Sequence, residues 1–474
     1  MNVIQFFGRS NPLIDDSLNG MLGPHEFHWG RVPPARRSQM RGWKILPVSL
    51  VLLLTASTSF AAGFRLPEAG AKAMGMGFAF TAQADDPSAI YFNPAGLTQL
   101  KGQNVMVGVT YVRENGGEFT GTTPVDNTTA VKSETQKSLN FFIPNAYYTR
   151  TTDSGNVAYG VGIFSPFGLG QEYHNGNTGI FRNQINKIDL RTIVVNPTIA
   201  FKVGDVLSVG AGIDWMYGKA QLTKTAYFPG VGNLYNLDLD GDGDAWGYNF
   251  GLLLKPVPNF RIGASYRSQF VLKIKDGDVE IRNINSTVPF VPNPAPPPAA
   301  FTTAQVFGGT SFDTKGNATI SMPATLALGV SYTMDRLTVN ADADWTFWHS
   351  YRSLPIDIRD NKGALLPDSN SPKNWEDVVA FRLGAEYRVT DPLALRAGFA
   401  YDPTPMPAST MGPELPDADR FDYMVGAGYK IGAVTIDGAF MYVDKFDRTV
   451  TNPQFSGTWT GDGWLVGLDV AYNF

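Results

Sequence analysis

Four carboxylates stand at alternate positions in the segment Asp238-Leu239-Asp240-Gly241-Asp242-Gly243-Asp244, which resembles the start of a calcium-binding loop. A calcium loop of this kind also needs a bidentate glutamate at its twelfth position. The twelfth residue counted from Asp238 is Asn249, whose neutral amide cannot replace that carboxylate. We therefore expect a solvated turn in this segment, with calcium binding as the less favoured alternative.

Histidine, cysteine and serine offer little further chemistry. The chain has four histidines, two of them near the amino terminus, so a three-ligand zinc site is not expected. Cysteine is absent, which excludes disulfides, thiolate catalysis and thiolate metal sites. His349 and Ser350 suggest a lipid hydrolase, but neighbours on a strand point to opposite faces, which is poor geometry for a Ser–His pair. The sequence predicts no catalytic residue, no metal site and no cofactor.

Charged residues recur instead on one face of alternating segments. They are Asp214, Arg261, Arg267, Asp342, Asp344, Arg382, Glu386, Arg388, Arg396, Asp422, Asp437 and Asp469. Because both signs are mixed on this face, we expect ion-pair networks that fill and stiffen a lumen, with a charge-selective pore as the alternative. The net charge of -5 argues against nucleic acid as a partner, since nucleic acid calls for a basic patch.

The element that must position such residues is clearest at the carboxyl terminus. Residues 464–474 alternate without a break, with large apolar side chains on one face and small or polar ones on the other. This pattern predicts a strand between lipid and a polar lumen. An exposed edge of this kind needs a partner, and the first strand of the same chain would close the sheet. The terminal Phe474 resembles the signal by which barrel-assembly machinery recognises its substrates.

Alternating runs recur from Gln103 onward, separated by turn residues. The clearest lie at 105–111, 157–163, 207–217, 246–254, 260–266, 326–332, 337–347, 381–389, 393–401, 421–429, 434–442 and 464–474. Less regular runs at 139–148 and 188–201 bring the total to about fourteen, an even number as single-chain bacterial barrels require. We predict an all-β transmembrane antiparallel barrel over residues 102–474, with long loops at 223–242 and 276–317, the second rich in proline.

The composition fits this class. The chain of 474 residues is 43% hydrophobic and has a mean hydropathy of -0.12, as expected when every second strand residue faces a polar lumen. No run of about 18 apolar residues is present that would predict a spanning helix.

Three segments precede the barrel. Residues 40–61 have the charged start, short apolar stretch and small-x-small end of a secretory signal, which predicts a mature start at Ala62. Residues 1–39 then form either an upstream extension from a wrongly chosen start codon or a long leader. Residues 62–101 show no sustained alternation and are rich in small residues, which predicts a plug rather than strand.

Several motifs, in order along the chain, resemble the FadL-type outer-membrane transporters. They are Ala62-Gly63-Phe64, Ala84-Asp85-Asp86-Pro87, Asn93-Pro94-Ala95-Gly96-Leu97, Phe164-Ser165-Pro166-Phe167-Gly168-Leu169 and Leu415-Pro416-Asp417-Ala418-Asp419-Arg420. The resemblance implies a fourteen-stranded barrel whose amino-terminal hatch, here residues 62–101, plugs the lumen. It also implies the transport of long-chain fatty acids or, in some branches, aromatic hydrocarbons.

The resemblance further implies capture in apolar pockets and sideways exit at a kinked third strand. Pro166 cannot donate to its neighbour and Gly168 and Gly170 weaken the ladder beyond Phe167, so a local break is expected, although an ordinary strand end is equally compatible.

Two hatch features are similar to gating elements of the family. Asn93-Pro94-Ala95 resembles the motif that faces the strand opening, but Asn-Pro also starts ordinary turns. Phe64 resembles the residue that reaches the inner pocket, although it could merely anchor the terminus. For a fatty-acid carboxylate, Lys202 and Arg396 are candidate cations by their position in the resemblance.

Three functional classes follow. We expect an outer-membrane, multi-pass transporter of hydrophobic compounds, with long-chain fatty acid as first choice and aromatic or alkane hydrocarbon as runner-up. A general aqueous porin or an outer-membrane lipid hydrolase are the alternatives of another class. We expect a monomer that contacts outer-membrane lipid and lipopolysaccharide.

Overall fold

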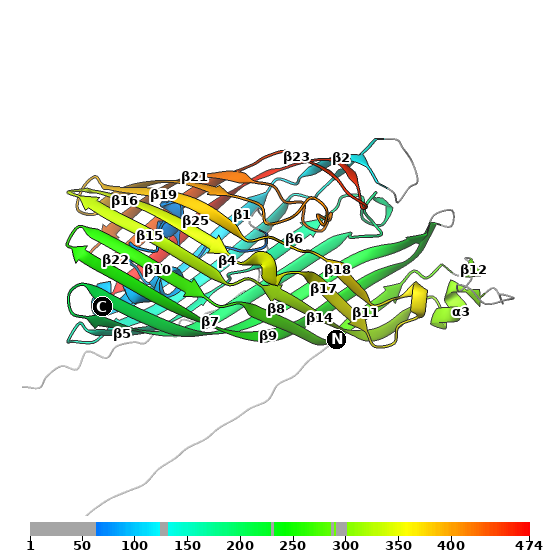
Figure 1. Ribbon diagram of the computed structural model, residues 1–474, viewed down its shortest axis with the longest axis horizontal. Helices are drawn as coiled ribbons and strands as arrows, with labels where there is room; N and C mark the ends of the chain where they lie inside the picture. Colours follow the sequence, from blue (N-terminus) through cyan, green and yellow to red (C-terminus); the bar gives the residue numbers. More distant parts are fainter. Residues whose placement is uncertain (1–62, 124–130, 229–231, 286–288, 291–300) are drawn as a thin grey trace, which may run out of the picture. The chain divides into compact units, whose positions relative to one another are not determined.

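The computed structural model describes residues 63–123, 131–228, 232–285, 289–290 and 301–474, and these form a closed antiparallel barrel of fourteen strands (Figure 1). Closure rests on the first wall strand, β1 (Gln103–Glu114), which pairs with both β4 (Leu139–Thr151) and the last strand, β25 (Asp462–Asn473). The predicted barrel and its closure by the first and last strands are confirmed. The predicted signal and upstream segments lie outside the described residues.

Between β4 and β25 the wall consists of β5 (Val157–Phe164), β6 (Gly168–Glu172), β7 (Lys187–Val203), β8 (Leu207–Phe228), β9 (Gly232–Val257), β10 (Phe260–Arg267), β11 (Phe270–Arg282), β14 (Phe312–Met322), β15 (Thr325–Met334), β16 (Leu337–Thr346), β17 (Ser353–Ile358), β18 (Ser369–Pro372), β19 (Val378–Arg388), β20 (Leu393–Asp402), β21 (Arg420–Ile431) and β22 (Val434–Lys445). Five of the fourteen wall strands are each divided into two elements: β5 and β6, β10 and β11, β14 and β15, β16 and β17, and β18 and β19.

Smaller elements lie outside the wall. A four-stranded sheet on the long-loop side joins β2 (Glu118–Thr122), β3 (Lys132–Thr135), β23 (Arg448–Thr451) and β24 (Ser456–Thr460). Other short pieces are β12 (Pro289–Phe290), β13 (Phe301–Thr302), α3 (Thr303–Phe307), η3 (Gly176–Thr178), η4 (Trp348–Ser350) and η5 (Gly363–Leu365).

The period-two pattern of β25 separates lipid from lumen as predicted. Val466, Leu468 and Val470 are 41–50% exposed on the outer face, whereas Leu465 and Asp469 on the inner face are buried. The outer face therefore meets the hydrocarbon of the bilayer and the inner face meets the hatch.

The hatch segment lies inside the lumen as α1 (Ala71–Gly75), α2 (Ala89–Phe92) and η1 (Pro94–Gln99), shown in blue in Figure 1. Its small residues allow close approach to the wall. Gly77 has a φ of 66°, and a Cβ there would meet the Leu383 carbonyl at 2.5 Å and the Phe399 amide at 2.9 Å. Only glycine fits both requirements. Within the described ranges, no helix is long and apolar enough to cross a membrane.

The lumen charges form the predicted ion-pair networks, and these also bind the hatch. Arg382 pairs with Asp344 at 2.8 Å and with Asp402 at 3.4 Å, and Arg420 extends the network to Asp422 at 3.0 Å. Other lumen carboxylates accept hydrogen bonds from backbone amides of the hatch. The Asp469 carboxylate, for example, accepts one from the Ala71 amide at 2.5 Å. One expected lumen residue differs, since Arg388 is exposed at the β19–β20 turn.

The predicted loop at 223–242 is strand in its described residues, and the one at 276–317 is strand at both ends. Residues 223–228 belong to β8, 232–242 to β9, 276–282 to β11 and 312–317 to β14, so the wall continues well above the membrane. Within them, Asp238–Asp244 is strand rather than a turn, with Asp238 opposite Thr223 and Glu280. Successive carboxylates on one strand face stand roughly 6.5 Å apart, so they do not wrap around one ion as a calcium loop does.

Candidate ligand-binding site

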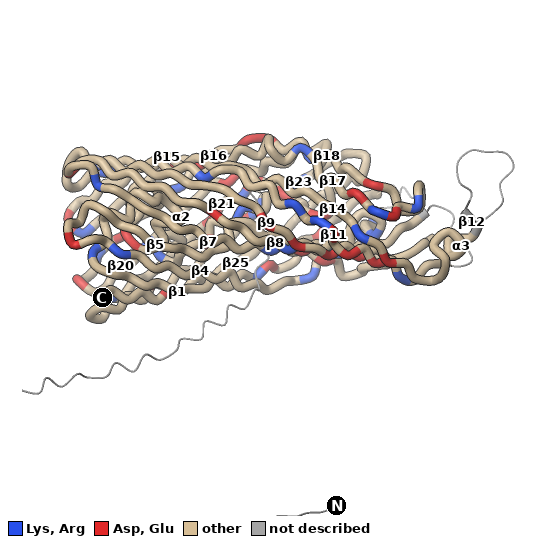
Figure 2. Tube along the Cα trace, turned by 90° about the horizontal axis from the view of Figure 1, so that it is seen from below, with Lys and Arg blue, Asp and Glu red and all other residues tan. Residues whose placement is uncertain are grey.

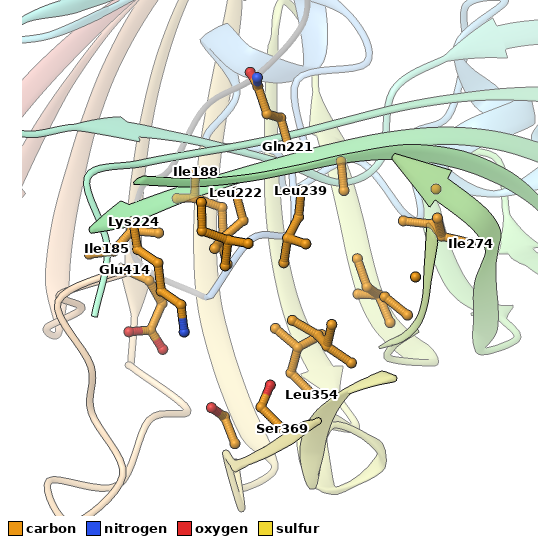
Figure 3. Close-up of a pocket in the computed structure, with 18 of the residues that line it drawn as sticks. Ile185, Ile188, Gln221, Leu222, Lys224, Leu239, Ile274, Leu354, Ser369 and Glu414 are labelled. Atoms are coloured by element: carbon orange, nitrogen blue, oxygen red, sulfur yellow. The ribbon is translucent and has the colours of Figure 1, made fainter. Parts of the chain in front are cut away.

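The extended strands enclose a cavity of about 380 Å³ on the long-loop side of the hatch, within the range of small-molecule sites. The lining is mainly aliphatic, and Figure 3 shows several of these side chains pointing into the space. They include Ile188 and Leu190 of β7, Leu222 of β8, Leu237 and Leu239 of β9, Ile274 of β11, Ile320 of β14, and Leu354 and Ile356 of β17. This surface is suited to an apolar ligand.

One end of the cavity is charged. Lys224 of β8, Lys373 after β18 and Glu414 of the β20–β21 loop all line it, and Figure 3 shows Lys224 and Glu414 together at that end. Lys373 makes an ion pair with Glu414. Lys224 makes no ion pair with any described residue, and the surroundings that bury it lower the pKa of its ammonium. The group combines two ammonium charges with one carboxylate.

Lys373 differs from Lys224 because of its partner. Burial by itself favours the neutral amine, but the neighbouring Glu414 carboxylate more than offsets this effect and holds the pKa of Lys373 above its usual value. Lys373 therefore stays charged, and the charged end has an excess of one positive charge that an anionic ligand could balance.

Phe64 reaches the same cavity from the hatch. Its ring lies in an aromatic cluster, 4.8 Å from Trp348, 5.4 Å from Tyr351, 5.6 Å from Trp375 and 6.0 Å from Phe167 between ring centroids. The residue before it, Gly63, adopts a φ of 69° against the two tryptophan rings. Phe64 therefore forms part of the cavity wall, at the side where the cavity meets the rest of the hatch.

The wall is interrupted beside Phe64. The ladder between β4 and β5 runs from Ala146 opposite Ile163 to Thr151 opposite Ala158, and β6 pairs with β7. Among the described residues no ladder pair joins 139–145 of β4 to 164–172, and contact resumes only at the bridge between Gln136 and Tyr173. Residues 165–167 thus divide this wall strand into β5 and β6, both of which pair with β7.

Backbone groups at the break bind the hatch instead of β4. The Leu66 amide donates to the Pro166 carbonyl at 2.8 Å, and the Gly168 amide donates to the Phe64 carbonyl at 3.0 Å. Between these bonds Arg65 stands opposite Phe167 as an antiparallel bridge. Gly168 and Gly170 both belong to β6, as buried residues paired with β7. The segment from Phe64 to Leu66 therefore lies along the inner side of the break.

The Asn93-Pro94-Ala95 motif lies elsewhere. The fully buried Asn93 donates to the Thr81 carbonyl at 2.8 Å and to the Leu252 carbonyl at 3.0 Å, and its side-chain oxygen accepts from the Ala95 amide. The motif packs on β8 and β9, where a Cβ on Gly210 or Gly251 would overlap it. The motif therefore joins the hatch to that wall. A different hatch residue, Tyr91 of α2, packs on Phe164 at the end of β5.

Neither cation expected from the resemblance lines the cavity. Lys202 pairs with the exposed Asp205 at 3.0 Å beside the β7–β8 turn. Arg396 is buried against the hatch and already bound by Glu386 and Asp437, each at 2.7 Å. The cations that line the cavity are Lys224 and Lys373, neither of which was predicted from the sequence as a site residue. Lys224 shares its strand face with Ala220 and Leu222, so alternation beyond residue 217 could have placed it inside.

Comparison with known proteins gives a consistent result over nearly the whole chain. The model of the outer membrane protein transport protein family (OMPP1/FadL/TodX) matches residues 52–474. The long-chain fatty acid transport protein of Salmonella typhi is 22% identical over 447 residues, covering 90% of this chain and 98% of its own length. Outer membrane protein P1 of Haemophilus influenzae is 26% identical with the same coverage.

Solved structures share the fold. A Pseudomonas aeruginosa FadL homologue superimposes with a TM-score of 0.71 at 19% identity, covering 87% of this chain and 100% of its own. The Pseudomonas putida toluene transporter TodX gives a TM-score of 0.64 at 18% identity, covering 87% of this chain and 99% of its own.

Proposed function

The chain belongs to the FadL and TodX family of outer-membrane transport proteins for hydrophobic compounds, and within that family we propose that its cargo is a long-chain fatty acid that leaves through the break beside β6. Members of the family are transporters and channels rather than enzymes. The proposal therefore concerns which hydrophobic compound the cavity takes and where the compound goes.

The main support for the proposal is that Phe64 takes part in both the cavity and the break. Its ring forms part of the cavity wall, and its carbonyl accepts a hydrogen bond from Gly168 at the break. A movement of this one segment would open the floor of the cavity and uncover the break together. Cargo could then pass sideways between β4 and β6 toward the membrane without crossing the hatch.

The charged end of the cavity supports a fatty acid over a hydrocarbon. Each methylene buried against the aliphatic lining contributes about 0.8 kcal/mol, which any long apolar cargo gains equally. Lys224 distinguishes the two kinds of cargo, because it is half-buried and has no carboxylate partner among the described residues. A cargo carboxylate supplies that partner, whereas toluene or an alkane does not.

One chain supplies the wall, the hatch and the cavity, so the transport unit we propose is a monomer. Its outer apolar band would contact membrane lipid, and the charged residues along the long-loop ends of β8, β9 and β11 (Figure 2) would lie at the level of lipopolysaccharide. The closing strand β25 is the segment we expect barrel-assembly machinery to recognise.

Uptake of labelled oleate and labelled toluene tests the proposal in cells that lack the native gene and express either the wild type or a variant. We expect oleate uptake by the wild type, and oleate binding in Lys224→Met that is weaker by about tenfold to a hundredfold, since a hydrogen bond to a charged group contributes about 1.5–3 kcal/mol. Lys202→Met is the matched control, because that lysine lies outside the cavity. Uptake of toluene without oleate would overturn the fatty-acid assignment.

A further inference from the structure

The loop between β20 and β21, residues 403–419, folds into the barrel instead of away from it. Met406, Met411, Leu415 and Ala418 are all buried. The Tyr173 hydroxyl donates to the Pro413 carbonyl at 2.6 Å, and the Gln171 amide donates to the same oxygen. The loop is thus fixed to β6 at Pro413, immediately before the residue that enters the charged end of the cavity.

Glu414 reaches Lys373 because Gly412, two residues earlier, has no side chain to block its carboxylate. A Cβ built on Gly412 would overlap the Glu414 carboxylate, and the three nearest atoms are all from that group. The side chains of Lys373 and Glu414 are 8% and 23% exposed, so their ion pair is shielded from solvent while the carboxylate remains accessible from the cavity. The loop therefore presents a carboxylate to the cavity at its cationic end.

We propose that Glu414 is an internal stand-in for the cargo carboxylate: it occupies Lys373 in the empty protein and yields it to a fatty acid, so that Glu414 limits the affinity for acids. This inference rests on the proposed function. The exchange is balanced in charge, because Lys224, Lys373, Glu414 and a cargo carboxylate together make two positive and two negative groups. Glu414 can turn to Lys224 at the same end (Figure 3) when the cargo takes its place.

A neutral hydrocarbon cannot make this exchange. Separating Glu414 from Lys373 without a replacement leaves a buried ammonium with no partner, which is strongly unfavourable. A carboxylate cargo supplies the replacement and keeps both lysines paired. Glu414 thus competes with acids for the site but places no equivalent competition on hydrocarbons, which need only the aliphatic lining.

The loop also connects this exchange to the hatch. Three residues after Glu414, the Asp417 carboxylate accepts from the Gly63 amide at 3.4 Å and from the Thr404 hydroxyl at 2.5 Å. Gly63 immediately precedes Phe64, the residue shared by the cavity and the break. Because Pro413 is fixed, displacement of Glu414 moves the segment after it and weakens the bond that holds Gly63.

Direct binding of oleate and of the neutral analogue oleyl alcohol to purified protein in detergent tests this inference. Glu414→Gln removes the competitor, and Gly412→Ala displaces the carboxylate without removing its charge. We expect both variants to bind oleate about fivefold to tenfold more tightly than the wild type, with oleyl alcohol unchanged. The control is Glu376→Gln, an exposed glutamate outside the cavity. Thermal unfolding followed by circular dichroism verifies that each variant is folded.

The outcomes separate the two proposals. If the wild type binds oleate and both variants bind it with wild-type affinity, Glu414 is not a competitor and the fatty-acid assignment stands. Tighter binding of oleate and oleyl alcohol alike would also overturn the stand-in, since it indicates a simple gain of space. If the wild type binds toluene but not oleate, both proposals fail. Faster hydrogen exchange of residues 63–70 with oleate than with oleyl alcohol would support the connection to the hatch, and equal exchange would contradict it.

Discussion

Arg65 of the hatch stands directly opposite Phe167 at the break, flanked by the bonds from Leu66 to Pro166 and from Gly168 to Phe64. In an antiparallel pair this pattern defines a position without its own hydrogen bonds, where the two Cα atoms approach to about 4.5 Å. The hatch therefore extends the barrel wall by one short strand at the place where the wall lacks a partner.

Cysteines at these two positions should lock the transporter. A separation of about 4.5 Å lies within the range that a disulfide spans, and the chain has no other cysteine. We expect Arg65→Cys combined with Phe167→Cys to lose most oleate uptake after oxidation and to recover it after reduction. The two single variants control for the loss of each side chain. Full uptake by the oxidised protein would exclude movement of this segment as the gate.

Oleate affinity should fall as pH rises from 6 to 10. Burial lowers the pKa of Lys224, so this amine loses its proton at lower pH than an ordinary lysine, whose pKa is about 10.4. A bound carboxylate favours the ammonium, so binding above that lowered pKa requires proton uptake and becomes weaker. Lys373, whose pKa is raised, stays charged. Titration calorimetry should show the decline in the wild type, and Lys224→Met should bind weakly with little dependence on pH.

Arg382→Met should destabilise the barrel. Its guanidinium bonds Asp344 and Asp402 and is almost completely buried, so the substitution leaves two carboxylates in the lumen with one cation fewer. Loss of one partner from a buried ion pair costs about 3–5 kcal/mol. Urea unfolding in detergent should show that loss, while Arg388→Met, at an exposed turn, should leave the free energy of unfolding nearly unchanged. An equal effect of both variants would contradict the role of the network.

Gly77→Ala should loosen the hatch. The new Cβ would meet the Leu383 carbonyl and the Phe399 amide, and the φ of 66° adds strain. In planar bilayers we expect low conductance from the wild type and clearly higher conductance from the variant. Gly363→Ala is the matched control, with a φ of 58° and open space around its Cβ position. High steady conductance from the wild type would favour an aqueous porin.

The wall could be predicted from the sequence because lipid imposes a simple rule. Each strand that crosses the bilayer must alternate, and β25 shows this most clearly, with Val466 and Leu468 outside and Asp469 inside. The same rule also placed Arg382 and Arg396 in the lumen, where they form ion pairs. Periodicity is local, so it is visible in a single segment.

The cavity could not be predicted in the same way. Above the membrane the outer face of β9 has Asp238 and Asp240 while the inner face has Leu237 and Leu239, which inverts the pattern expected for a membrane strand. Polarity there indicated a loop, although the structure forms a wall. The charged end joins Lys224, Lys373 and Glu414 from segments far apart in the chain, and only the closed barrel brings them together.

The motif at Asn93 illustrates a third case. Its Asn-Pro sequence indicated a turn, and the turn is present, with Asn93 capping η1. Its contacts on β8 and β9 depend on Gly210 and Gly251, which lie more than a hundred residues away. A turn motif predicts local geometry but not the surface on which it packs.

The buried ion pairs beside the hatch and the aliphatic cargo lining lie on different parts of the circumference. The buried ion pairs that accompany the hatch lie mainly on β16, β19, β20, β21 and β22, whereas the aliphatic lining comes mainly from β7, β8, β9, β11 and β14. Substitutions that reshape the lining therefore leave these ion pairs intact. A barrel of this kind can acquire a new substrate range through changes on one side, without first re-establishing its own closure.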